Sequence, residues 1–215
     1  MVISTRLIVL NTTKVGDSSL VVHALSRELG RRSFIAAAGK GASLFQPMNI
    51  LDAEVVENPK SELWRLRRVA PAWPLTGIRG NIHKNTVTLF LGELLFRSIR
   101  EGASEEGLFD WCAAKILTLD AMEDDFANFH LRFILELAGA LGFSPSAEDL
   151  LPFADEHASQ IKTLLAASEA DFMLIPLNGR ERSAIASALV DYLGYHLETP
   201  LNIRSLRVLG ELYQR

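Results

Sequence analysis

Cysteine is nearly absent from this sequence, with Cys112 as the one example in 215 residues. A single thiol cannot form an internal disulfide framework, and it cannot supply a multi-cysteine zinc site. Charge-free apolar runs are also short, so none reaches the roughly 18 residues that a membrane-spanning helix needs. The segment Met1 to Leu10 carries Arg6 inside its apolar run and lacks the order of a signal peptide. We therefore expect a cytoplasmic protein with no membrane span and no bound metal.

Catalytic motifs are missing as well. The sequence contains no G-x-S-x-G, no P-loop and no H-E-x-x-H, and its histidines lack metal-ligand spacing. Cys112 and His130 both fall on apolar helical stripes, which favours a buried small side chain and a core histidine over a nucleophile or a ligand. The acids at 123–125 could form an acid pair or an ion site, but charge at a helix N-terminus is the favoured interpretation. We expect no catalytic residue and no cofactor.

The sequence does contain enough apolar material for a core, and its charge is unevenly distributed. Hydrophobic residues make up 48% and charged residues 22%, which is ordinary for a globular protein. The net charge of -4 conceals a division, because residues 1–90 hold 12 lysines and arginines against 6 acids, whereas residues 91–215 hold 10 against 20. A basic half attracts phosphate and an acidic half does not, so the two parts should have different partners. The alternative is that both halves merely carry solvated surface charge.

The segment from Thr5 to about Val69 has the pattern of short strands separated by turn residues. The predicted strands are residues 7–10, 18–26, 33–37, 49–57 and 63–69. Alternation gives the last of these strands two faces. One face carries Leu63, Arg65, Arg67 and Val69, and the other carries Trp64, Leu66 and Arg68. Five short strands in about 65 residues favour a small closed sheet, for which the OB-type barrel is the commonest solution.

The spacing of apolar residues becomes helical after a linker at residues 71–77, which contains two prolines and a glycine. Helices are predicted from about Asn81, over Gly107 to Leu119, from near Asp124 to Leu141, over Arg180 to Tyr195 and over Ile203 to Tyr213. Short helices and loops are expected at 150–178. The predicted architecture is therefore α+β, with a five-stranded OB-type barrel over residues 1–77 and an all-helical domain over residues 78–215.

Basic residues gather where a nucleic acid could contact the predicted barrel. Arg31 and Arg32 follow a turn, Lys40 lies between two glycines in a loop, and three arginines alternate with Trp64 on the last strand: Arg65, Arg67 and Arg68. A charged groove with exposed aromatic side chains is what single-strand binding by OB folds requires. Arginine is suited to this role because its planar fork contacts phosphate oxygens in pairs. The alternative is a solvated strand face with Trp64 in the core.

Several segments resemble the RecO family, in the same order along the chain. They are Val9-Leu10, Val15 to His23 and Leu29-Gly30-Arg31 at the start; Gly39-Lys40-Gly41 and Leu44-Phe45-Gln46-Pro47 next; Ala127 to Phe133 and Leu141 to Pro145 in the middle; and Arg180 to His196 and Ile203 to Leu209 near the end. Each motif is weak alone, but the collinear set covers most of the chain and is fairly specific.

The resemblance implies an N-terminal OB fold and a following helical domain. Members of the family bind single- and double-stranded DNA and anneal complementary strands. They act with RecR and with single-stranded DNA-binding protein to load RecA, so DNA repair and recombination in the bacterial cytoplasm, at the nucleoid, is the implied function. This agrees with a basic β half and an acidic helical half.

The resemblance also indicates site residues. A DNA-contact role is carried onto Arg31, Arg32 and Lys40, and by extension onto Lys14, Arg65, Arg67 and Arg68. In the helical domain, Arg132 is the candidate to meet the carboxylate of the tail of the single-stranded DNA-binding protein, on position and charge alone.

Two departures from the family pattern matter. Many members carry a cysteine-based zinc module, whereas Cys112 stands alone here, so the branch resembled is the one without zinc. The basic loop that tends to follow the Lys-Gly element is also short, because residues 41–44 carry no base. An adaptor that binds proteins and little or no DNA is therefore the alternative function, and a small hydrolase with an unseen site is a third, least favoured one.

Overall fold

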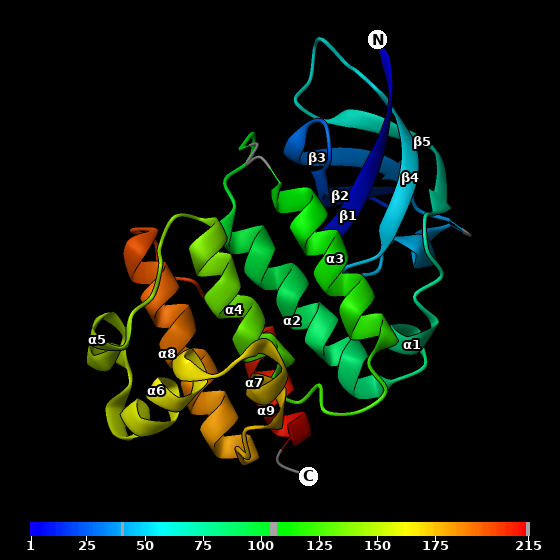
Figure 1. Ribbon diagram of the computed structural model, residues 1–215. Coiled ribbons are helices and arrows are strands. Elements are labelled where there is room, and N and C mark those ends of the chain that lie inside the picture. The colour runs from blue at the N-terminus through cyan, green and yellow to red at the C-terminus, as the bar shows by residue number, and fades with distance from the viewer. Residues whose placement is uncertain (40, 104–106, 214–215) are drawn as a thin grey trace.

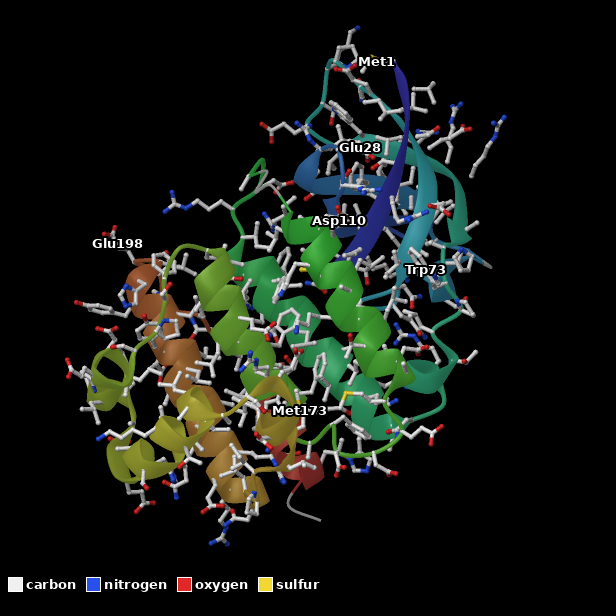
Figure 2. All side chains as sticks on the ribbon, viewed as in Figure 1. Met1, Glu28, Trp73, Asp110, Met173 and Glu198 are labelled. Atoms are coloured by element: carbon white, nitrogen blue, oxygen red, sulfur yellow. The ribbon has the colours of Figure 1, made fainter. Side chains whose placement is uncertain are left out.

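The computed structural model describes residues 1–39, 41–103 and 107–213, with the side chain of Tyr213 left out. Its two parts lie one above the other in Figure 1, with the strands at the top and the helices below. Met1 lies at the end of the strands that is far from the helices (Figure 2).

The strands form a closed barrel in the order β1-β2-β3-β5-β4. Their bounds are β1 Val2–Val15, β2 Ser19–Ser26, β3 Gly30–Ala37, β4 Ile50–Val56 and β5 Trp64–Pro71. All neighbouring strands are antiparallel except β3 and β5, which run parallel over a short stretch. This confirms the five-stranded OB-type barrel predicted from the sequence.

Strand β1 is much longer than the predicted segment 7–10, because it serves two neighbours in turn. Its residues 2–8 pair with β4 and its residues 7–15 pair with β2, with a register shift between Val9 and Asn11. Leu7 and Val9 point into the barrel core, whereas Ile8 and Leu10 belong to the core shared with the helices. Both faces of β1 are therefore buried here, which explains its continuous apolar run.

Strand β5 alternates as predicted only in its first half. Leu66 is buried in the barrel and Trp64 packs partly against the same core, while Arg65 and Arg67 are exposed. The predicted grouping of Arg68 with Trp64 and Leu66 is wrong. Arg68 has a left-handed φ of 47° beside the register shift between β4 and β5, and this bulge directs its side chain outward.

The helices follow the barrel in sequence, and among them α2 lies against β1 and contacts α1, α4 and α9. Their bounds are α1 Thr76–Arg79, α2 Ile82–Ser98, α3 Leu108–Ala121, α4 Phe129–Ala140, α5 Ala147–Leu150, α6 Ala158–Ala166, α7 Glu169–Leu174, α8 Gly179–His196 and α9 Ser205–Tyr213. The side chains of Asn81, Ser146 and Asn178 cap α2, α5 and α8. Among the described residues, no helix combines the length and apolar character that crossing a bilayer requires.

The start of α4 differs from the prediction. The helix begins at Phe129 rather than near Asp124, so the acids at 123–125 lie in the preceding loop and not in a first helical turn. Asn128 precedes the helix without capping it. Its amide instead donates to the carbonyl oxygens of Phe172 and Ile175 and accepts from Arg182, which ties this loop to α7 and α8.

The barrel and the helices share one core. Gly92 of α2 lies so close to β1 that an added Cβ would be 2.7 Å from the carbonyl oxygen of Leu10. Arg79 of α1 donates to Asn49 and to the carbonyl oxygen of Pro47, in the connection between β3 and β4. Helix α1 thus crosses the predicted boundary at residue 77, and the division into two domains stays a prediction.

Candidate nucleic-acid interface

An arginine and a tryptophan meet where β3 and β5 run side by side. Phe34 is the partner of Trp64 in the parallel register, and Arg32 lies two residues earlier on β3. The guanidinium carbon of Arg32 is 4.3 Å from the centroid of the Trp64 ring. Both side chains are half-buried, and Arg32 makes no ion pair with the described residues. A cation and an aromatic ring are therefore presented together at the edge of the barrel.

Arg65 and Arg67 lie on the outward-facing side of β5, whereas Trp64 and Leu66 on the same strand face the barrel core. Both arginines are exposed, and Arg65 is in register with Ile35 on one side and Val56 on the other. Neither arginine lies within 4 Å of an acid among the residues that the structure describes. Unpaired guanidinium groups retain their full charge for an external phosphate, so we call Arg32, Trp64, Arg65 and Arg67 the β5 surface.

Arg31 lies on the other side of β3 and is almost fully buried, with 8% of its surface exposed. Its guanidinium covers the ring of Phe96 on α2 at 4.8 Å and lies 3.7 Å from Glu101. Its backbone pairs with residues 102 and 103 of the α2–α3 connection. Burial lowers the pKa of the Arg31 guanidinium. The pKa of the neighbouring His23 is also lowered, mainly by burial and to a smaller extent by the positive charge of Arg31. This arginine joins the barrel to the helices.

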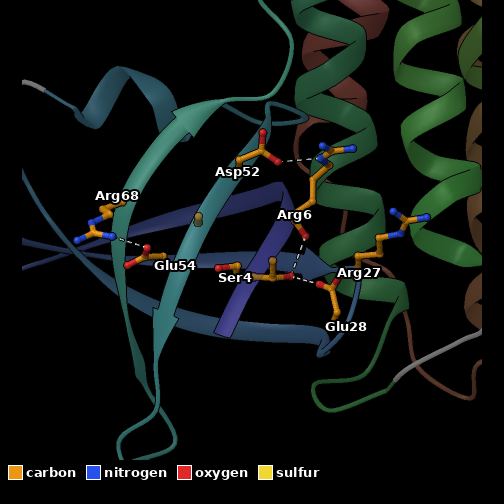
Figure 3. Close-up of a pocket in the computed structure, with 9 residues that line it drawn as sticks. Ser4, Arg6, Arg27, Glu28, Asp52, Glu54 and Arg68 are labelled. Atoms are coloured by element: carbon orange, nitrogen blue, oxygen red, sulfur yellow. Dashed lines mark hydrogen bonds and ion pairs between the residues drawn. The ribbon is translucent and has the colours of Figure 1, made fainter. Parts of the chain in front are cut away.

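Arg68 lines a cavity of about 420 Å³ on the outer face of β1 and β4, which sequence reasoning did not find. Figure 3 shows that its arginines face carboxylates, with Arg6 2.9 Å from Asp52 and Arg68 2.7 Å from Glu54. Arg27, at the same cavity, pairs with Asp110 at the start of α3.

The charges of this cavity are therefore largely balanced. Arg6 is also held by the ring of Trp73, 4.7 Å from its guanidinium carbon. A balanced cavity lacks the excess positive charge that attracts phosphate. The sequence signal for it was Arg6 itself, a lone charge inside an apolar run.

The remaining basic candidates of the barrel lie elsewhere. Lys14 is exposed beside the β1–β2 hairpin, in register with Leu20 and outside the part of β1 that pairs with β4. Lys40 lies outside the described residues. The structure thus brings Arg32 and Trp64 together and exposes Arg65 and Arg67 on the outward-facing side of β5. Arg31 is instead buried against α2, and Arg68 is paired with Glu54.

In the helical part, Arg132 belongs to a network of charges. Its Nε donates to Glu136 at 2.6 Å, and the same carboxylate lies 2.8 Å from Lys115 and accepts from the indole of Trp111. Burial alone would raise the pKa of Glu136, but the hydrogen bonds from Lys115, Arg132 and Trp111 outweigh it and hold that pKa below its ordinary value. The guanidinium of Arg132 also lies 5.4 Å from the ring of Phe172.

Cys112 and His130, the two residues that the sequence placed on apolar helical stripes, are buried. Burial raises the pKa of the Cys112 thiol, which keeps it protonated at neutral pH. Burial lowers the pKa of His130 to about 3, with the charge of Arg182 adding to the effect. No three His, Cys, Asp or Glu side chains in residues 1–39, 41–103 and 107–213 are grouped to hold a metal ion.

The fold places the chain among proteins with an OB-type barrel, a class whose members bind oligonucleotides or oligosaccharides, and here the barrel is joined to a helical part. The family model described as Recombination protein O N terminal matches residues 1–73, and the one described as Recombination protein O C terminal matches residues 79–150. The chain belongs to the RecO family, as the resemblance in its sequence predicted, and its family function lies in DNA repair and recombination.

The curated relatives agree over nearly the whole length. The DNA repair protein RecO of Phocaeicola vulgatus is 29% identical, with 96% of this chain and 97% of the relative covered. The protein of the same name from Flavobacterium johnsoniae is 28% identical, with 99% of this chain and 100% of the relative covered. Both names are those of repair proteins and neither names an enzyme.

Proposed function

We propose that this chain is a recombination mediator that binds single- and double-stranded DNA, promotes strand annealing, and acts with RecR and single-stranded DNA-binding protein to load RecA. The observation that carries the DNA-binding part is the β5 surface. There, the guanidinium of Arg32 covers the ring of Trp64, and the following strand residues Arg65 and Arg67 are exposed on the outer face of the barrel with no acidic partner among the described residues.

This surface suits nucleic acid for two reasons. Phosphate contacts by arginine supply affinity that does not depend on base sequence. An aromatic ring can stack on any base, because every base has a π-face, so Trp64 supplies a preference for unpaired strands. Lys14 and Lys40 are proposed as further phosphate contacts on grounds of charge. Arg31 is proposed to act through the barrel–helix contact, and Arg68 is tied to Glu54.

The test is the fluorescence anisotropy of labelled oligo-dT titrated with protein at several salt concentrations. Arg65→Glu/Arg67→Glu should weaken binding by at least about 10-fold. Each lost phosphate contact should lower the salt slope by about 0.7 on a single strand. Arg100→Glu/Lys162→Glu is the matched control, since both residues are exposed in the helical part and the formal charge changes equally. Equal weakening by the two double variants would contradict a β5 surface.

The helical domain is proposed to bind the acidic tail of the single-stranded DNA-binding protein through Arg132. The Nε of this guanidinium donates a hydrogen bond to Glu136, and 28% of the side-chain surface is exposed. Arg132→Ala should weaken binding of a labelled tail peptide several-fold and leave oligo-dT binding unchanged. Unchanged peptide binding would remove Arg132 from the partner site.

An adaptor with little direct DNA binding is the second candidate, and one observation favours it. Four barrel arginines already face carboxylates, which reduces the charge left for phosphate: Arg6, Arg27, Arg31 and Arg68. If the wild-type protein does not bind oligo-dT even at low salt, the adaptor function replaces the DNA-binding one.

A further inference from the structure

A groove of about 410 Å³ lies where the barrel meets the helical part, between the middle of β1, α2 and α9. Its barrel side is formed by Leu10, Asn11 and Pro47. Its helical side includes Leu89 and Val208, which are 42% and 43% exposed although both are aliphatic. The groove therefore spans both parts of the chain and offers apolar surface to a ligand.

Three arginines surround this apolar strip, namely Arg97 on α2, Arg204 just before α9 and Arg207 in its first turn. Arg207 is 86% exposed at its side chain and has one distant acidic neighbour, Glu211 at 3.7 Å. The helical half of the chain carries twice as many acids as bases. Three arginines at one groove are thus a local exception to an acidic surface.

Glu93 is the acid that lines the groove, and it is occupied by the fold. Its carboxylate accepts hydrogen bonds from the backbone amides of Arg204 and Ser205, from the Ser205 hydroxyl and from Nε of Arg97. Burial alone would raise its pKa, but these bonds outweigh burial and keep the pKa of Glu93 below its ordinary value. This carboxylate therefore anchors the start of α9 and leaves the Arg204 guanidinium without an acidic partner among the described residues.

The barrel contributes directly to the groove, because Asn11 of β1 lines it. Lys14 lies three residues further along β1, with its side chain on the opposite face of the strand, so the positive charge at the groove comes from α2 and α9 and not from the barrel.

We propose that this groove holds a second segment of single-stranded DNA, with the phosphates on Arg204 and Arg207 and the bases against Leu89 and Val208. The inference rests on the proposed function, since it extends a strand that the barrel binds. It assigns a DNA contact to the closing helix of the acidic half. A long strand would then engage both parts of the chain, whereas a short one would engage the barrel alone.

The experiment compares labelled dT10 and dT30 by anisotropy, with the full chain and with Arg204→Glu/Arg207→Glu. Both side chains are exposed, and Arg204 uses its backbone amide for the fold. We expect dT30 to bind about 10-fold more weakly to the variant, with a salt slope lower by about 1.4 for two lost contacts. Binding of dT10 should change less than twofold, and Arg100→Glu/Lys162→Glu should change neither.

The outcomes separate this inference from the barrel proposal. If Arg65→Glu/Arg67→Glu abolishes binding of both lengths and the groove variant matches the wild type, the groove is not a DNA site and the barrel proposal stands. If the groove variant alone weakens dT30, the groove is supported and the β5 surface is not. If Arg204→Glu/Arg207→Glu instead weakens binding of a labelled peptide rich in Asp and Leu and leaves dT30 binding unchanged, the groove binds acidic peptides and the inference is overturned.

Discussion

The guanidinium carbon of Arg32 lies 4.3 Å from the centre of the Trp64 ring, across the short parallel pairing of β3 and β5. A second arginine–tryptophan contact exists on the same barrel, between Arg6 and Trp73 at 4.7 Å. The two differ in charge balance, because Arg6 is paired with Asp52 and Arg32 has no acidic partner among the described residues. Only the contact between Arg32 and Trp64 therefore combines an aromatic ring with positive charge that is available to DNA.

This difference gives a matched pair of variants. Trp64→Ala should weaken oligo-dT binding by about 10-fold, since stacking on one base is worth about 1–3 kcal/mol. Trp64→Phe should retain most of the affinity, because an aromatic face remains. Trp73→Ala removes an equally large ring near a neutralised arginine and should leave binding unchanged in the same anisotropy assay. A larger loss for Trp73→Ala would move the DNA site to the opposite face.

Removal of the Arg31 side chain should mainly affect stability, whereas removal of the Arg65 side chain should mainly affect DNA binding. Arg31 fills the contact between the barrel and α2, so Arg31→Ala should lower the free energy of unfolding by about 1–3 kcal/mol. Arg65 is exposed, so Arg65→Ala should change the free energy of unfolding by less than about 0.5 kcal/mol and should weaken DNA binding instead. Urea unfolding with dT10 anisotropy on both variants checks this. If Arg31→Ala instead weakened DNA binding strongly and left the free energy of unfolding unchanged, Arg31 would be a direct DNA contact.

Gly92 and Gly139 are helical glycines in different surroundings. A Cβ at Gly92 would meet the carbonyl oxygen of Leu10 at 2.7 Å and Cβ of Pro47 at 3.1 Å, whereas one at Gly139 would meet nothing within 4 Å. Gly92→Ala should therefore cost about 1–3 kcal/mol through overpacking, while Gly139→Ala should stabilise by about 0.5–1 kcal/mol. Thermal melting of both proteins measures the difference. A stabilised Gly92→Ala would mean that β1 and α2 separate easily.

His130 should make stability depend on pH. Its pKa falls from 6.5 to about 3 on folding, so the unfolded chain binds the proton more readily, and stability is lost as pH falls from about 6.5 towards 3. Between pH 7.5 and pH 5 the loss should be about 2 kcal/mol. His130→Gln removes that titration, so its urea midpoint should vary less with pH than that of the wild type. Parallel pH profiles for the two proteins would contradict a buried neutral histidine.

Local pattern was sufficient for the main elements of the fold. Turn residues and alternation located all five strands, and the helical spacing of apolar residues located α2. These features are set by neighbours in sequence, because side-chain direction repeats every two residues in a strand and every 3.6 in a helix. The length of β1 could not be found in this way, since it depends on pairing with β4, about 50 residues away.

The candidate site shows the same limit. The sequence determined which residues carry positive charge, that the charge gathers in the first half, and that Trp64 lies among arginines. It could not distinguish Arg31 from Arg32, which are adjacent in sequence but lie on opposite faces of β3, one against Phe96 and one against Trp64. Tertiary structure decided which arginines are buried or neutralised and which remain free, because burial and ion pairing depend on residues that only folding brings within reach.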